Sequence, residues 1–112
     1  KAEAIAGAEF SEDGVAYATS DVATSNTQII NAQVADELLS VTGVKSSYVL
    51  FEEDGSVFVS ARSLGDMNVQ WIMERLGGGG HFTMAAAQMT ETHMQEAIEQ
   101  LKAAIDEYLE ME

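Results

Sequence analysis

The sequence contains no cysteine and no proline among its 112 residues. Without cysteine, a disulfide framework and a thiolate metal site are both excluded, and a reducing cytosolic location is compatible with the composition. The absence of proline fits regular elements joined by turns of Gly, Asn and Asp. No apolar run is long enough to span a membrane, and residues 1–10 lack the features of a signal peptide. We therefore expect a soluble chain, and its first residue, Lys1, suggests a piece cut from a longer protein.

Basic residues are also scarce: 5 Lys and Arg stand against 19 Asp and Glu, which gives a formal net charge of −14. Proteins bind long nucleic acids largely by neutralising their phosphates. A domain this acidic is therefore a poor general nucleic-acid binder. Two of the few cations, Arg62 and Arg75, lie close in sequence to a run of glycines. That is enough positive charge for a small ligand that carries one or two phosphates.

The length corresponds to one domain, which buries about 60 to 70% of the surface of its unfolded chain. Short strands are predicted over Lys1–Phe10 and Val15–Thr19. Ser47–Phe51 and Ser56–Arg62 are rich in apolar, β-branched and aromatic residues, and they predict a β-hairpin with the four-residue acidic turn Glu52–Gly55. This hairpin is expected at the centre of the fold.

Helices are predicted where apolar residues recur at helical spacing. Their expected ranges are about Ser25 to Ser40 (ended by Gly43), about Asn68 to Leu76, and about Thr92 to Met111. Capping boxes at Ser25/Gln28 and Thr92/Gln95 are expected to open the first and the last. The last helix ends on acidic residues, the wrong sign for a helix C-terminus, so we expect its final turn to fray. Met84–Met89 fits either a short helix or a buried strand. The fold class is thus α/β (α+β): one domain with a mixed sheet and helices packed on it.

The most distinctive stretch is Gly77–Gly80, followed directly by His81. Composition alone favours a flexible linker. However, the apolar helical face before it and the apolar segment after it indicate a loop inside a folded unit. Glycines can turn sharply and direct several N–H groups at one anion, and a histidine can donate to or accept from a phosphate oxygen. The alternative to a linker is therefore a phosphate-binding loop.

Ser60 and Arg62 are expected on one side of their strand, because strand side chains alternate between faces. Two interpretations of Arg62 stay open: a solvated or salt-bridged surface residue, and a guanidinium that binds phosphate.

His93 is interpreted as a surface residue. The glycine run lacks the lysine of a Walker loop and the spacing of a dinucleotide fingerprint, and the two histidines do not form a metal-binding motif. The residues therefore suggest a place to hold a phosphate, without a means of activating water.

The residues Val59–Ser63, Gly65, Asn68–Gln70, Leu76–His81 and Ala85–Ala86, in this order, resemble the DHH-associated C-terminal domain of DHH-family phosphoesterases. Within that family they are most similar to the membrane-attached cyclic-di-AMP phosphodiesterases of the GdpP type. The resemblance extends over Asn31–Gln33 and Ala35–Leu39 and so covers most of the chain after about residue 20.

The resemblance implies the substrate-binding half of a hydrolase. In this family a preceding domain carries an Asp-His-His motif and binds two manganese ions that activate water. The associated domain binds the nucleotide. The substrate-contacting positions carried over to this chain are Ser60, Arg62, Ser63, Gly77, Gly78, Gly79, Gly80 and His81. The chain itself has no Asp-His-His motif, so no catalytic or metal-binding residue is expected in it.

The implied partners are cyclic-di-AMP or its linear dinucleotide and the metal-binding domain of the same parent, with no long nucleic acid and no membrane contact by this domain. A homo-oligomer is compatible with the sequence. The implied location is a cytoplasmic domain of a cell-membrane protein. Two other readings stay open: a hydrolase domain for short oligoribonucleotides or 3′-phosphoadenosine phosphate, and a non-catalytic nucleotide-sensing module.

Overall fold

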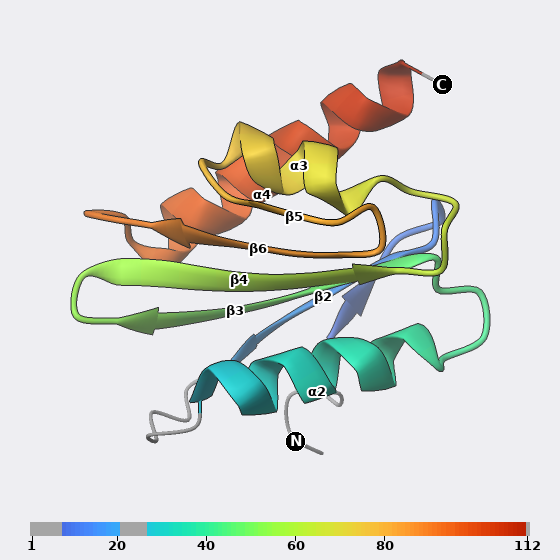
Figure 1. Ribbon diagram of the computed structural model, residues 1–112. Coiled ribbons are helices and arrows are strands. Elements are labelled where there is room, and N and C mark those ends of the chain that lie inside the picture. Colours follow the sequence, from blue (N-terminus) through green and yellow to red (C-terminus); the bar gives the residue numbers. More distant parts are fainter. Residues whose placement is uncertain (1–7, 21–26, 112) are drawn as a thin grey trace.

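A computed structural model describes residues 8–20 and 27–111, and within them the chain forms one six-stranded mixed sheet with helices on both faces (Figure 1). The strands follow the order β1-β2-β3-β4-β6-β5 across the sheet, and all neighbours are antiparallel except β2 and β3. Their bounds are β1 Glu9–Phe10, β2 Val15–Ser20, β3 Ser46–Glu53, β4 Ser56–Ser63, β5 Gly79–Gly80 and β6 Met84–Met89. The predicted fold class is confirmed.

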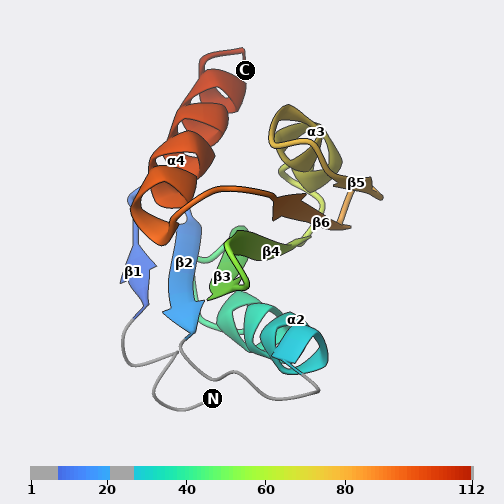
Figure 2. The same cartoon turned by 90° about the vertical axis from the view of Figure 1, so that its left-hand side faces the viewer.

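The helices are α2 (Thr27–Leu39), α3 (Val69–Arg75) and α4 (Met94–Glu110). α2 connects the parallel pair β2 and β3 and packs on one face, while α3 and α4 pack on the other (Figures 1 and 2). Each face has its own apolar cluster. On the α2 side it comprises Ala16, Ala18, Val34, Ala35, Leu38, Val44 and Val49. On the α3/α4 side it includes Tyr48, Leu50, Val57, Val59, Ile72, Met73 and Leu101.

The central hairpin is confirmed, but its turn is shorter than predicted. Glu52 and Glu53 belong to β3 and pair with β4, so only Asp54 and Gly55 connect the strands. Both have positive φ, 54° and 79°. A two-residue Asp-Gly turn of this kind matches the right-handed twist of its strands, so the hairpin closes without the four-residue turn that was predicted.

The helices begin and end close to the predicted positions, but one N-cap differs from its prediction. Asn68 caps α3, because its side chain accepts a hydrogen bond from Trp71 N at 3.2 Å. The N-cap of α4 is His93 rather than Thr92, and the Thr92 hydroxyl donates to Thr90 O instead. The expected capping box at the start of α4 is therefore wrong.

Other predictions have mixed outcomes. Residues 84–89 form a strand, which settles the open alternative. The first predicted strand is described only at Glu9–Phe10, and the Ser25 cap lies outside the described residues. Gly43 lies beyond the end of α2 at Leu39 and has φ 90°, so it turns the following loop rather than capping the helix.

Candidate functional site

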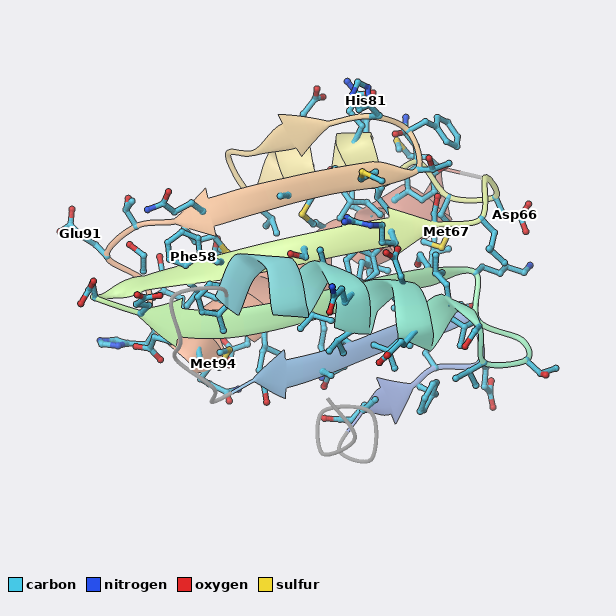
Figure 3. The ribbon with its side chains drawn as sticks, turned by 60° about the horizontal axis from the view of Figure 1, so that its bottom comes forward. Phe58, Asp66, Met67, His81, Glu91 and Met94 are labelled. Carbon is cyan, nitrogen blue, oxygen red and sulfur yellow. The ribbon has the colours of Figure 1, made fainter. Side chains whose placement is uncertain are left out.

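A hollow of about 520 Å³ lies on the α2 face of the sheet, where β4, β6 and β5 extend past the helix. Figure 3 looks onto this face, with α2 in front, β6 and β5 beyond it, and His81 at the end of β5. Ala32 of α2 forms one wall. The predicted site residues among its lining are Ser60, Arg62, Gly78, Gly79, Gly80 and His81.

The floor of the hollow consists of three rows of side chains. Directly opposed residues of antiparallel strands share a face, so cross-strand pairs define each row. The rows are Phe58 with Gln88, Ser60 with Ala86 and Gly79, and Arg62 with Met84 and His81. Small residues thus occupy the middle of the floor, and larger functional side chains occupy its two ends.

Arg62 is held firmly at one end of the hollow. Its Nε donates to Asp36 Oδ1 at 3.1 Å, and its Nη1 donates to Ala61 O at 2.9 Å. The Arg62 side chain is only 12% exposed, whereas Asp36 is 62% exposed. Within the described part of the chain, Nη2 has no hydrogen-bond partner, so part of the guanidinium remains available to an anion.

Ser60 and His81 add polar atoms to the hollow that Arg62 lines. Ser60 is half-buried and His81 is exposed, and both line the hollow. Among the side chains that the structure describes, neither has a hydrogen-bond partner, so a hydroxyl and an imidazole are free to bind a ligand. A hydroxyl, a guanidinium and an imidazole are all able to donate to phosphate oxygens.

The structure corrects how the glycine loop was expected to bind an anion. Gly77 N donates to Glu74 O (3.1 Å) and Gly78 N to Met73 O (2.8 Å), which is the Schellman pattern that closes a helix. His81 N donates to Met84 O at 2.7 Å. These amides are used in capping α3 and in pairing β5 with β6. They do not converge on one spot, so anion binding here would depend mainly on side chains.

One amide of the loop stays outside this pattern. His81 and Met84 exchange both of their backbone hydrogen bonds, and bonded and non-bonded pairs alternate along an antiparallel ladder. Gly80 and Ala85 therefore form a non-bonded pair, and Gly80 N–H points away from β6 at the edge of the sheet. It can assist binding only at the rim of the hollow.

The glycines have different structural roles. A Cβ at Gly78 would lie 2.1 Å from Ala86 O, and one at Gly80 would lie 2.6 Å from Ala85 Cα, so both positions are too close to β6 for a side chain. A Cβ at Gly79 would meet nothing within 4 Å. Because Gly79 is paired with Ala86, that Cβ would project onto the floor of the hollow. Gly79 thus keeps the hollow open, while Gly78 and Gly80 are required by the fold.

Three residues that the sequence singles out do not line the hollow. Ser63 is buried and accepts a hydrogen bond from Gly65 N at 3.3 Å, and strand alternation places it on the face opposite Arg62. Gly77 serves as the αL cap of α3, with φ 87°. Arg75 pairs with Glu107 of α4 at 2.7 Å and lies 5.0 Å over the Trp71 ring. Neither Ser63 nor Gly77 lines the hollow, and Arg75 projects from the α3/α4 side.

Sequence reasoning missed Asp36, Phe58 and Gln88. Asp36 lies on α2 and meets Arg62 only through the packing of that helix on the sheet, so no local pattern reveals the pair. Phe58 shares a strand face with Ser60 and Arg62, a signal that was present in the alternation. Gln88 could be placed only once residues 84–89 were known to be a strand paired with β4. His93 is confirmed as a surface residue, 87% exposed and 3.4 Å from Glu52.

In residues 8–20 and 27–111, no three His, Asp or Glu side chains gather closely enough to hold a metal ion. None of the helices in these same ranges has the length and apolar character needed to cross a bilayer.

Comparisons with known proteins identify close relatives. The chain is 50% identical over 111 residues to the cyclic-di-AMP phosphodiesterase GdpP of Geobacillus thermodenitrificans (strain NG80-2), covering 98% of this chain and 17% of the relative. It is 46% identical over 101 residues to the cyclic-di-AMP phosphodiesterase PdeA of Listeria monocytogenes serotype 1/2a (strain 10403S), covering 89% of this chain and 15% of the relative. The chain therefore spans about a sixth of the length of these curated relatives.

A solved structure supports the fold. An exopolyphosphatase-related protein from Bacteroides fragilis superposes with a TM-score of 0.80 at 19% identity, covering 96% of this chain and 33% of that chain. The model of the DHHA1 domain matches residues 14–111. This match includes the strands, the helices and the glycine loop that form the hollow. The chain therefore belongs to the DHHA1 domain family, the associated domain of DHH-family phosphodiesterases.

Proposed function

We propose that this chain is the substrate-binding domain of a phosphodiesterase that hydrolyses cyclic-di-AMP to its linear dinucleotide. The relatives are phosphodiesterases named for cyclic-di-AMP, and the chain covers only a small part of each. The ligand of this domain is then cyclic-di-AMP or the linear dinucleotide, and its phosphate lies at the Arg62 and His81 end of the hollow, next to Ser60.

One observation supports this proposal above the others. Arg62 and Ser60 share a face of β4 and His81 follows β5, yet all three line one hollow with unused donors. Arg62 is also partly desolvated, and a charge-assisted hydrogen bond is stronger where water is excluded. The arrangement is suited to holding a phosphate in place, and holding the reacting group is a large part of catalysis of such reactions.

The chemistry of water activation is assigned to the rest of the parent protein. We propose, on the resemblance to DHH-family phosphoesterases, that a metal-binding domain of the same parent holds manganese. The parent is proposed to be a cell-membrane protein whose DHHA1 domain lies in the cytoplasm. The 112-residue chain alone is expected to hydrolyse neither cyclic-di-AMP nor the linear dinucleotide when manganese is added.

The test compares two arginines by titration calorimetry of the chain with the linear dinucleotide. Arg62→Ala is expected to weaken binding by about 2 to 4 kcal/mol, the loss of a charge-assisted phosphate contact. Arg75→Ala is the matched control, because Arg75 pairs with Glu107 on the other side of the molecule and should leave affinity unchanged. Circular dichroism checks that both variants fold. Equal affinity of Arg62→Ala and the unmodified chain would refute the proposed phosphate site.

The same pair of variants in the parent enzyme tests the functional assignment. Arg62→Ala should lower kcat/KM for cyclic-di-AMP by about the same free energy, and Arg75→Ala should not. Product analysis with the parent identifies the preferred substrate among cyclic-di-AMP, short oligoribonucleotides and 3′-phosphoadenosine phosphate. Faster turnover of either of the last two would assign the domain to a different substrate.

A further inference from the structure

The two ends of the hollow differ in chemistry. One end carries Arg62 and His81, and the other carries Phe58 and Gln88. Phe58 and Arg62 are four residues apart on β4, which separates them by about 13 Å at about 3.3 Å per strand residue. Between them lies the row of small residues that includes Ala86 and Gly79. The floor is thus an open path from a cationic end to an aromatic one.

Phe58 provides a fixed aromatic surface. Its ring stacks on Phe51 with centroids 4.9 Å apart and an interplanar angle of 11°. Phe51 is buried, whereas Phe58 is half-buried and lines the hollow. Figure 3 shows Phe58 on β4, away from His81. A ring that is supported on one side by another ring is well placed to stack with a planar ligand group, as aromatic residues do with bases.

Gln88 lies opposite Phe58 on β6, exposed and in the same row of the floor. Within the described residues its amide makes no hydrogen bond, so its donor and its acceptor are both available. An amide that presents one donor and one acceptor matches adenine, which offers N6–H and N7 on neighbouring atoms. Gln88 can therefore read the edge of a base that stacks near Phe58.

We infer that Phe58 and Gln88 form the base-recognition end of the hollow, with adenine as the base. This inference rests on the proposed function, since it assumes that the phosphate lies at Arg62 and His81. The spacing of the two ends is about the span of one extended nucleotide. Phe58 supplies stacking for any base, and Gln88 supplies the preference for adenine.

The experiment compares AMP with ribose 5-phosphate, which has the phosphate and the sugar but no base. Both are titrated calorimetrically into the 112-residue chain, into Gln88→Ala and into Phe58→Leu. We expect AMP to bind about tenfold more tightly than ribose 5-phosphate, in line with base–aromatic stacking at an open site. Each variant should reduce that ratio by about threefold or more and leave the affinity for ribose 5-phosphate unchanged.

Gln100→Ala is the matched control, because Gln100 is an exposed glutamine on α4 that pairs with Glu96 outside the hollow. Its ratio of affinities should equal that of the unmodified chain. Gln88 is exposed, so its variant tests the inference even if Phe58→Leu folds poorly. An unchanged ratio in Gln88→Ala, or equal binding of AMP and ribose 5-phosphate, would overturn the inference. Loss of both ligands in Arg62→Ala, with an unchanged ratio in Gln88→Ala, would retain the phosphate site and reject only the base end.

Discussion

Two substitutions in the glycine run, Gly78→Ala and Gly79→Ala, should separate the requirements of the fold from those of the site. Each adds a single methyl group, and the two positions are adjacent. At Gly78 the new Cβ would lie 2.1 Å from Ala86 O and 2.6 Å from Ala87 Cα, against ordinary carbon contacts of about 3.5 to 4 Å. At Gly79 it would contact no protein atom within 4 Å.

These distances determine the expected changes in stability. The methyl at Gly78 must push β5 and the end of α3 away from β6, an overpacking effect of about 3 kcal/mol. Loss of glycine entropy in the unfolded chain offsets about 0.4 to 1 kcal/mol of this. For a domain of this size the net loss corresponds to a fall in Tm of about 10 to 20 °C. Gly79→Ala should leave Tm unchanged or raise it slightly, because only the entropy effect remains.

Ligand affinity, unlike thermal stability, should respond to the substitution at Gly79. The Gly79→Ala methyl projects onto the hollow beside Ala86, so we expect affinity for the linear dinucleotide to fall by about 1 to 2 kcal/mol although the fold is intact. Thermal denaturation followed by circular dichroism, together with calorimetric titration, measures both quantities. A Gly78→Ala variant as stable as the unmodified chain would refute the close packing of β5 on β6. A Gly79→Ala variant with unchanged affinity would refute the position of the ligand.

Three further predictions concern other parts of the molecule. Asp36→Asn keeps an acceptor for Arg62 Nε but removes a negative charge, so phosphate affinity measured by calorimetry should rise about threefold, and a fall would show that the carboxylate mainly orients the guanidinium. Tyr48→Phe should raise the free energy of unfolding in urea by about 1 kcal/mol, because the buried Tyr48 hydroxyl has no partner in the described part of the chain; a clear loss would reveal one. Amides of the last turn of α4, near Glu110, should exchange faster with deuterium than those near Leu101, and equal protection would contradict the expected fraying.

Local sequence patterns predicted the helices and strands better than they predicted the contacts between them. The alternation in Val57–Ser63 and the helical spacing before Gly77 were enough to place β4 and α3, because each depends on residues close in sequence. The Asp-Gly pair at residues 54–55 signals a two-residue turn, but the two preceding glutamates made the turn look longer. The N-cap of α4 was mispredicted because the Thr92 hydroxyl donates to the backbone of the preceding turn rather than capping the helix.

The candidate site could be predicted only in part, because it is made by long-range packing. Arg62, Ser60 and His81 were expected together, and the structure does bring them to one hollow. The use of the glycine amides could not be foreseen, since it depends on the Schellman cap of α3 and on pairing of β5 with β6. Asp36 reaches Arg62 across 26 residues of sequence, through the docking of α2 on the sheet.

We propose that a nucleotide phosphate binds at the Arg62 end of the hollow on the α2 face, and a crystal structure of the 112-residue chain with the linear dinucleotide would show where it lies. We expect a phosphate oxygen within about 3 Å of the Arg62 guanidinium, with Ser60 and His81 beside it. A phosphate bound by the backbone amides of Gly77–Gly79, or anywhere on the α3/α4 face, would contradict it.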